Sequence, residues 1–374
     1  MKKLLLCTLS GSVFFSLNAF GFTTLAKNAL LMDADTGYIM FEKQADIPMP
    51  PASMSKLMTV YIVFEALKDG RLSMDDEFIV SENAWKKGGT TSGGSTMFLE
   101  PNTKVKVGDL LKGVVIQSGN DACITIAENM SGSEEAFAEL MNEKAKELGL
   151  TNSTFKNATG LPHPEHKMSA KDLAKLAKVL INDFQEYYPI FAEKEFTYNG
   201  ITQANRNPLL SKINGADGLK TGHTNDSGYG LTASVKKNDG SRLILVLNGL
   251  KSSKERDYES NRLASYGSQG FITKTLVYKD KVMASIPVWL GTTETVDAVT
   301  EKRYLVTQGR GKRLPKVSIS YDSPISAPIK KGDVIGQLKI DNGSKIDTLN
   351  LLAANDVGKA GYFKKLKQII LSWF

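Results

Sequence analysis

The sequence has few cysteines and histidines, and this scarcity narrows the chemistry open to it. Among 374 residues, 2 are cysteine and 3 are histidine. Cys7 lies in an N-terminal leader, so the mature chain would keep only Cys123, which can form no internal disulfide and is most simply a small buried hydrophobe. His163 and His166 are spaced like metal ligands, but flanking prolines deny them helical geometry and no third ligand is evident. We expect no disulfide, no metal and no other cofactor.

The sequence also lacks a basic patch of the kind that binds nucleic acid. Its 47 Lys and Arg against 40 Asp and Glu give a net charge of only +7. The basic excess sits at the two ends of the chain and is not interleaved with aromatic residues. Residues 359–374 contain four lysines and no acid. This distribution indicates a membrane partner and no nucleic acid.

Residues 1–26 resemble a secretory signal peptide. Two lysines follow Met1, and residues 4–22 are uncharged and largely apolar. Thr24 and Ala26 supply small residues at positions −3 and −1 for cleavage before Lys27, with Ala19 as a less suitable alternative. The other interpretation is an uncleaved N-terminal membrane anchor.

Residues 357–374 predict an amphipathic helix at the C-terminus. At about 100° per residue, the apolar side chains share one arc, and Lys364, Lys365, Gln368 and Ser372 oppose it. The segment is shorter than the roughly 20 apolar residues that span a bilayer. We expect it to lie in the membrane interface; the alternative is docking on its own β domain or on a partner. The apolar arc comprises Tyr362, Phe363, Leu366, Ile369, Ile370, Trp373 and Phe374.

Residues 27–273 predict an α/β (α+β) domain. Its antiparallel sheet is built from both ends of the segment, with a helical block inserted between them. Residues 71–108 are expected to be loop-rich, with a Gly/Ser loop that could be filler or a flap beside a site. After residue 273 short strands are separated by Gly, Pro and Asn-Gly, which predicts a small all-β domain over 274–356. The expected strands are 29–32, 38–41, 218–220, 229–235 and 242–250, and the expected helices are 54–67, 109–116, 121–130, 134–148, 169–181 and 253–271.

Ser53 and Lys56 form a Ser-x-x-Lys motif at the start of the most apolar helical stretch of the mature sequence. At a spacing of i and i+3, the two side chains lie on one helix face and can reach each other. Burial would favour a neutral lysine, which could activate the serine as the nucleophile of an acyl-transfer enzyme. The motif alone is weak, because it also occurs at Ser153 and Ser234. It is equally consistent with a structural role.

Two further motifs follow in order, Ser118-Gly-Asn120 between two helices and Lys220-Thr-Gly222 at the end of a strand. Alone, each is more often a turn or an exposed strand end. With Ser53 and Lys56 they resemble the low-molecular-weight penicillin-binding proteins, and specifically the D-alanyl-D-alanine carboxypeptidases with a C-terminal β domain and an amphipathic anchor. The longer stretches 94–99, 205–207 and 217–224 carry the same resemblance. It implies a β-lactamase/transpeptidase-like catalytic domain.

The resemblance implies a role for each residue of the first two motifs. Ser53 would attack the carbonyl between two D-alanines of a peptidoglycan pentapeptide, with Lys56 as its base. Water would then hydrolyse the acyl-enzyme. Ser118 would relay a proton toward the departing D-alanine, and Asn120 would hold the peptide or Lys56. β-Lactam antibiotics would be covalent inhibitors.

The resemblance also implies a binding site for the substrate's terminal carboxylate. Lys220 and Thr221, in the strand that ends with Gly222, would bind this carboxylate, and Lys220 would be the second cation that lowers the Lys56 pKa. The backbone N–H groups of Ser53 and His223 would form the oxyanion hole. Arg206 is either a further carboxylate-site cation or part of a surface salt bridge.

Three other functions use the same fold. A serine β-lactamase would need a glutamate-positioned water; Glu165 lies in the corresponding stretch without the surrounding pattern of that family. An endopeptidase would cleave cross-links next to a D-alanine. A catalytically silent wall-binding protein would have no reason to keep all the motifs. We expect an exported enzyme held peripherally on the periplasmic face of the cytoplasmic membrane.

Overall fold

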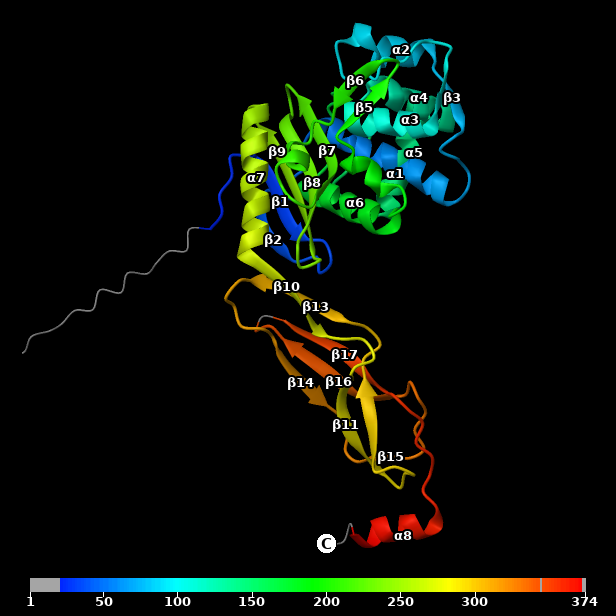
Figure 1. Ribbon diagram of the computed structural model, residues 1–374, viewed down its shortest axis with the longest axis vertical. Coiled ribbons are helices and arrows are strands. Elements are labelled where there is room, and N and C mark those ends of the chain that lie inside the picture. The colour runs from blue at the N-terminus through cyan, green and yellow to red at the C-terminus, as the bar shows by residue number, and fades with distance from the viewer. Residues whose placement is uncertain (1–20, 344, 372–374) are drawn as a thin grey trace, which may run out of the picture.

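The first domain, named the catalytic domain after the expectation above, is built on a five-stranded antiparallel sheet. A computed structural model describes residues 21–343 and 345–371 of the chain (Figure 1). Most of the leader, with Cys7 and Ala19, and also Ser372, Trp373 and Phe374 at the C-terminus, lie outside the described residues. The sheet has the order β2-β1-β9-β8-β7, so the N-terminal hairpin lies beside strands from the far end of the domain, as predicted. Its strands are β1 (Asn28–Asp33), β2 (Ile39–Lys43), β7 (Ala216–Thr224), β8 (Gly228–Lys236) and β9 (Arg242–Leu250).

Helices cover both faces of this sheet. One face carries the inserted helical block, where Leu30 and Ile244 of the sheet share a core with α1, α4 and α6. The other face carries α7, whose Leu263 and Ala264 pack against Leu245 and Leu247 (Figure 1). The helices are α1 (Lys56–Lys68), α2 (Glu82–Gly88), α3 (Val107–Lys112), α4 (Asn120–Ser131), α5 (Glu134–Glu147), α6 (Ala170–Asp183) and α7 (Ser253–Gly270).

The helix boundaries follow the capping signals in the sequence. Ser133 and Ser169 accept hydrogen bonds from the third residue after each of them, at the N-termini of α5 and α6. α1 ends at Lys68, and Gly70 follows with φ of 71°. These helices confirm the predicted pattern.

Two local expectations differ from the structure. Ser53 does not open the α-helix: it lies in the 3-10 helix η1 (Ala52–Ser55), and α1 begins at Lys56. Ala52, directly before Ser53, has φ of 49°, which lies outside the right-handed helical region. Residues 71–108 also hold regular structure that their polar composition obscures, namely α2 and the short hairpin of β3 (Glu77–Ile79) and β4 (Lys104–Lys106).

Shorter elements complete the inserted block. A second hairpin lies close to the end of β7 that carries the Lys-Thr-Gly motif, and a π-helical turn separates α3 from α4. These elements are η2 (Thr90–Ser92), η3 (Gly113–Gln117), η4 (Tyr188–Ala192), β5 (Glu195–Tyr198), β6 (Ile201–Ala204) and η5 (Pro208–Ser211).

The C-terminal domain is all-β, as predicted. Its six-stranded sheet has the order β14-β16-β17-β12-β11-β15, and a separate pair, β10 with β13, lies next to the catalytic domain (Figure 1). Its core is small and made mainly of Val, Ile and Leu. The strands are β10 (Phe271–Val277), β11 (Val282–Trp289), β12 (Thr295–Val299), β13 (Tyr304–Gly309), β14 (Lys316–Ser320), β15 (Ile325–Ser326), β16 (Val334–Asp341) and β17 (Ile346–Ala353).

Hydroxyl groups join the two domains at the β1-β2 hairpin. Thr273 Oγ1 donates to Asp33 Oδ2 at 2.6 Å, and the hydroxyls of Thr36 and Thr307 are 2.8 Å apart. Asp33 is fully buried, and its other carboxylate oxygen accepts from the backbone of the same turn. The junction therefore satisfies a buried carboxylate with side chains from both domains.

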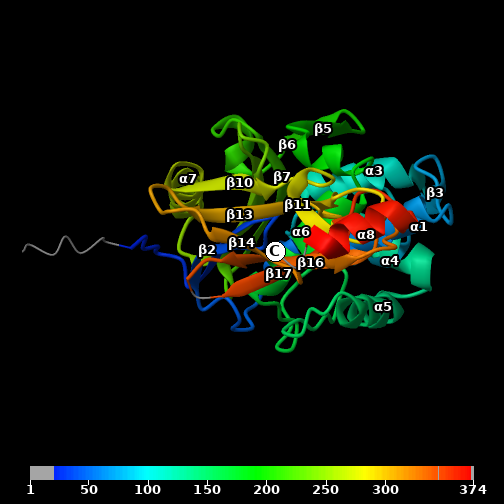
Figure 2. The ribbon, with the colours of Figure 1, turned by 90° about the horizontal axis from the view of Figure 1, so that it is seen from below.

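Helix α8 (Tyr362–Leu371) lies at the end of the β domain farthest from the catalytic domain (Figures 1 and 2). Its polar side contacts that domain: Gln368 Oε1 accepts from Leu290 N at 2.9 Å, and Lys364 Nζ donates to Thr292 O at 2.8 Å. Its apolar side chains are exposed, Phe363 by 86% and Tyr362 by 77%. Among residues 21–343 and 345–371, no helix is both long enough and apolar enough to cross a membrane.

Candidate active site

Ser53 and Lys56 are in direct contact. The 3-10 geometry of η1 stacks residues three apart, and Nζ of Lys56 lies 2.9 Å from Oγ of Ser53. The Lys56 side chain is fully buried at the start of α1, in the large core of the helical block. Ser153 and Ser234, the other two matches to the motif, have no such contact: Ser153 Oγ donates to Asp172, and Ser234 Oγ accepts from Arg242.

Two other acceptors hold the Lys56 amine. Nζ donates to Asn120 Oδ1 at 2.8 Å and to the backbone carbonyl of Thr159 at 2.6 Å. Burial lowers the pKa of Lys56, and the guanidinium of Arg206 lowers it further. Desolvation and the nearby cation thus favour the uncharged form of the lysine, and the acceptors fix the position of its amine.

Ser118 and Asn120 reach the site because the helical block is interrupted between α3 and α4. The π-helical turn η3 (Gly113–Gln117) ends at Ser118, whose φ of 63° reverses the chain before α4 starts at Asn120. Gly113 allows this turn to pack closely, because a Cβ there would lie 2.3 Å from Met97 Sδ. Both polar residues are more than nine-tenths buried beside Lys56.

The Gly/Ser loop predicted as filler or flap lies beside the site. Ser95 O accepts from Asn120 N at 2.8 Å. The buried Asp121 carboxylate accepts from Thr96 Oγ1 at 2.5 Å and from the backbone of residues 97 and 99. These contacts attach the loop firmly to the N-terminus of α4.

Strand β7 forms the opposite wall and brings Lys220 close to Lys56. Gly222 permits the approach of β7 to η1, because a Cβ there would lie 2.8 Å from Pro51 O. Lys220 is 2% exposed, and its pKa is lowered well below the usual value, first by burial and then by Lys56. Lys56 and Arg206 thus both disfavour a charge on Lys220, and Arg206 also lowers the pKa of Lys56.

A cavity of about 500 Å³ opens over Ser53 between these walls. The His223 side chain is exposed and stacks on Tyr229, with ring centroids 3.8 Å apart, so the ring turns away from the buried lysines. The cavity is lined by Ser53, Ser95, Ser118, Ala204, Asn205, Arg206, Thr221, Gly222, His223, Tyr229 and Arg256.

The sequence from residue 18 to residue 252 matches the family model for Peptidase S11, D-alanyl-D-alanine carboxypeptidase. The chain belongs to this family of serine peptidases. The D-alanyl-D-alanine carboxypeptidase DacC of Escherichia coli is 41% identical over 355 residues, which cover 93% of this chain and 88% of the relative. A D-alanyl-D-alanine endopeptidase of Escherichia coli is 31% identical but covers only 59% of this chain and 70% of its own length.

The second domain has a match of its own. Residues 271–359 match the C-terminal domain of penicillin-binding protein 5. The crystal structure of penicillin-binding protein 5 from Haemophilus influenzae superposes with a TM-score of 0.79 at 37% identity, covering 90% of this chain and 98% of that one. The likeness to carboxypeptidases of this family therefore spans both domains, as the sequence motifs predicted.

Arg256 is a cavity residue of this carboxypeptidase-family chain that the sequence analysis missed. It lies in the first turn of α7, where its guanidinium approaches the Tyr229 ring at 5.8 Å and its Nε is buried without a protein partner among the described residues. Burial lowers its pKa. The sequence carried one signal for Arg256, namely its position in the first turn of a predicted helix. A cation is unfavourable there, so its presence indicates another role.

Arg206 faces the same cavity and takes part in no surface salt bridge with an acid in residues 21–343 and 345–371. Its Nη1 donates to Ser95 Oγ at 2.6 Å, and its backbone carbonyl accepts from Arg256 at 3.4 Å. In the same residues, no group of three or more His, Cys, Asp or Glu side chains could hold a metal. His166 is instead buried, with Nδ1 accepting from Lys156 N.

Proposed function

We propose that this chain is a serine-type D-alanyl-D-alanine carboxypeptidase in which Ser53 forms the acyl-enzyme and Lys56 is the base. The observation that carries the proposal is the environment of Lys56: a fully buried amine held between Ser53 Oγ, Asn120 Oδ1 and the Thr159 carbonyl. The family assignment supports the reaction class. The substrate would be a peptidoglycan pentapeptide stem.

The geometry around Lys56 orients its lone pair. Asn120 Oδ1 and the Thr159 carbonyl can only accept, so a neutral amine directs one N–H to each of them. The remaining tetrahedral position, the lone pair, then faces Ser53 Oγ, which can donate its proton. As Ser53 Oγ attacks the carbonyl carbon between the two D-alanines, this proton passes to Lys56 Nζ.

Collapse of the tetrahedral intermediate breaks the bond to the terminal D-alanine. Ser118, at the cavity wall opposite β7, would pass a proton to the leaving amine. The backbone N–H groups of Ser53 and His223 would stabilise the oxyanion, each donor being worth about 3 kcal/mol. Hydrolysis of the Ser53 ester by water releases the shortened peptide and regenerates the enzyme.

The terminal carboxylate of the substrate would bind among Lys220, Thr221, Arg206 and Arg256. Arg256 Nε is buried without a protein partner among the described residues, which suits a planar anion. A bound carboxylate would favour the charged form of Lys220, and that charge would in turn favour neutral Lys56. Substrate binding would therefore prepare the base.

Other functions of the same superfamily fit less well. Glu165, the candidate for a β-lactamase base, pairs with Lys156 at 3.0 Å and is exposed, so it is not directed into the cavity over Ser53. The endopeptidase relative covers a smaller share of the chain than the carboxypeptidases do. A silent wall-binding protein would not need a buried lysine beside Ser53.

We also propose that α8 attaches the enzyme to a membrane surface, on the periplasmic face of the cytoplasmic membrane. The helix uses Gln368 and Lys364 to contact the β domain and presents Tyr362 and Phe363 away from it. This orientation supports interfacial binding over docking of the apolar side on its own domain. The catalytic domain would then stand off the membrane by the length of the β domain.

We propose an export signal at residues 1–26, cleaved before Lys27, with the site after Ala19 as the alternative. Two contacts bear on this choice: the Phe22 ring centroid lies 5.1 Å from that of Phe41, and Thr24 Oγ1 donates to the buried Glu259 at 2.6 Å. Cleavage before Lys27 would remove both contacts, and cleavage after Ala19 would keep them. N-terminal sequencing of the exported protein tests this choice.

Two assays on the purified protein test the enzymatic proposal. We expect release of D-alanine from a pentapeptide mimic and a covalent adduct with a labelled penicillin, and Ser53→Ala should abolish both. Persistence of the adduct in that variant would show that another residue is the nucleophile. Measuring the lifetime of the adduct separates a carboxypeptidase from a β-lactamase, because only the latter releases penicillin rapidly.

A further inference from the structure

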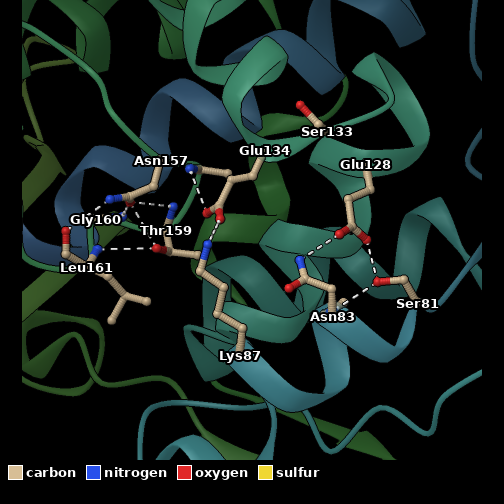
Figure 3. Close-up of polar contacts among 12 residues, drawn as sticks. Ser81, Asn83, Lys87, Glu128, Ser133, Glu134, Asn157, Thr159, Gly160 and Leu161 are labelled. Carbon is tan, nitrogen blue, oxygen red and sulfur yellow. Dashed lines mark hydrogen bonds and ion pairs between the residues drawn. The ribbon is translucent and has the colours of Figure 1, made fainter.

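The carbonyl that accepts from Lys56 belongs to a tight turn organised by one side chain. Asn157 Oδ1 accepts from Gly160 N at 2.7 Å, from Thr159 Oγ1 at 2.9 Å and from Thr159 N at 3.2 Å (Figure 3). Asn157 Nδ2 donates to Leu161 O at 3.1 Å. The Asn157 amide therefore fixes the peptide unit that contains the Thr159 carbonyl and the peptide unit before it.

A buried carboxylate supports the same turn from α5. Glu134 is 4% exposed, and its Oε1 accepts from Ala158 N at 3.3 Å. Its Oε2 pairs with Lys87 Nζ of α2 at 2.5 Å, which compensates the buried charge (Figure 3). The carbonyl of Ala158 accepts from Thr59 Oγ1 of α1 at 2.7 Å. The residue before Thr159 is thus held at both its N–H and its C=O.

A second carboxylate in the same region makes similar contacts without reaching the turn. Glu128 of α4 accepts from Ser81 Oγ at 2.5 Å and from Asn83 Nδ2 at 2.8 Å, and so ties α2 to α4 (Figure 3). Neither partner contacts residues 157–161 or Lys56. Glu128 therefore provides a matched control for a carboxylate that only joins helices.

We propose that Asn157 and Glu134 are positioning residues for the catalytic base: they hold the Thr159 carbonyl in place, and this carbonyl keeps the lone pair of Lys56 directed at Ser53. Without the carbonyl, one N–H of Lys56 has no fixed acceptor, and the amine can rotate so that an N–H, instead of the lone pair, faces the Ser53 hydroxyl. The inference rests on the proposed role of Lys56 as base.

The test measures acylation of the full chain by a labelled penicillin, separating the rate constant of acylation from the dissociation constant of the preceding complex. In Asn157→Ala we expect acylation to slow about 10- to 100-fold, the range of one lost orienting interaction, with no change in that dissociation constant. Asn157→Asp keeps the Oδ1 acceptor but loses the donor to Leu161 O, and should restore part of the rate. A purely structural role would change the melting temperature and leave the acylation rate of the folded protein unaltered.

The acylation rates of the Glu134 and Glu128 variants are then compared. Glu134→Ala should slow acylation about tenfold, whereas Glu128→Ala, at a less buried carboxylate, should leave it within about twofold of the wild type. Glu134→Gln keeps an acceptor for Ala158 N, and its acylation rate should lie between those of Glu134→Ala and the wild type. If Glu134→Ala does not fold, Glu134→Gln replaces it and should still acylate more slowly than the wild type. Equal effects of the Glu134 and Glu128 variants, or a wild-type rate in Asn157→Ala, would overturn the inference.

Lys56→Ala separates this inference from the proposed function. If this variant is inactive while the Asn157 and Glu134 variants acylate normally, the positioning role fails and Lys56 remains the base. If Lys56→Ala itself acylates at the wild-type rate, the assignment of the base fails, and the positioning role fails with it.

Discussion

The two domains differ in the burial of their lysine side chains. In the catalytic domain Lys56 is fully buried and Lys220 is 2% exposed. In the β domain, every lysine among the described residues 274–343 and 345–356 is exposed. Both domains have ordinary apolar cores, so folding alone does not call for buried ammonium groups. Because burial of a charge is costly, the two buried lysines indicate where the fold gives up stability for chemistry.

The largest expected effect comes from removing one buried lysine and, as a control, one exposed lysine. Lys56→Ala should slow acylation by penicillin about 10²- to 10⁴-fold, the usual contribution of a general base. Lys339→Ala, on strand β16 of the β domain, should leave the rate unchanged. Stopped-flow acylation of both variants checks this difference, which similar rates would contradict.

The exposed apolar side chains of α8 can be compared in the same way with exposed apolar side chains of the β domain. The double variant Tyr362→Ser, Phe363→Ser should weaken the free energy of binding to anionic lipid vesicles by about 4 kcal/mol, because each large side chain loses about 2 kcal/mol of transfer free energy. Co-sedimentation with the vesicles measures this binding. D-alanine release from a soluble peptide should not change.

The control variant removes two exposed apolar side chains from the β domain itself. Val334 and Ile346 are each 60% exposed, on β16 and β17. Val334→Ser, Ile346→Ser should bind vesicles like the wild type. If both double variants lose binding equally, α8 is not the specific attachment site.

Acid should destabilise the catalytic domain through His166. Burial lowers the pKa of His166 from 6.5 to about 4. The unfolded chain therefore binds a proton between these values that the folded chain does not. Neutral His166 contributes its full stability above pH 6.5, and that stability is lost as the pH falls toward 4.

The size of this loss is about 3 kcal/mol, from about 1.4 kcal/mol per pKa unit. Between pH 6.5 and pH 4 the free energy of unfolding of His166→Gln should therefore fall by about 3 kcal/mol less than that of the wild type. Denaturant unfolding at several pH values measures this difference. The same substitution at the exposed His163, whose charge contributes less than burial to the lowered His166 pKa, should change the pH dependence much less. Parallel curves for all three proteins would rule out His166 as the source.

The smallest expected effect compares two arginines. Arg256→Gln should raise the KM for a pentapeptide mimic about tenfold, since a hydrogen bond to a charged group contributes about 1.5 kcal/mol, while kcat changes little. Arg303→Gln, at an exposed position of the β domain, should change neither. A fall in kcat alone would place Arg256 in the chemical step instead of carboxylate binding.

Periodicity and capping residues predicted most of the catalytic domain. The hairpin at residues 29–41, the helices beginning after Ser133 and Ser169, and the strands around the Lys-Thr-Gly motif all rest on local signals. α2 and its neighbouring hairpin were missed, because short elements in polar sequence carry little periodicity. Ser53 was placed in an α-helix, because the apolar pattern of residues 54–67 does not distinguish a first 3-10 turn from an α-helical one.

What the sequence determined by itself was the set of reactive groups and their local spacing. Ser53 and Lys56 are three residues apart, a separation that allows their side chains to meet on one face of a helical turn. What only the tertiary structure decided was the environment of that pair: the burial of Lys56, the approach of Lys220 and Arg206, the entry of Arg256, and the Thr159 carbonyl 103 residues away in the chain. Desolvation and long-range hydrogen bonds are properties of packed neighbours, so they exist only once distant segments have come together.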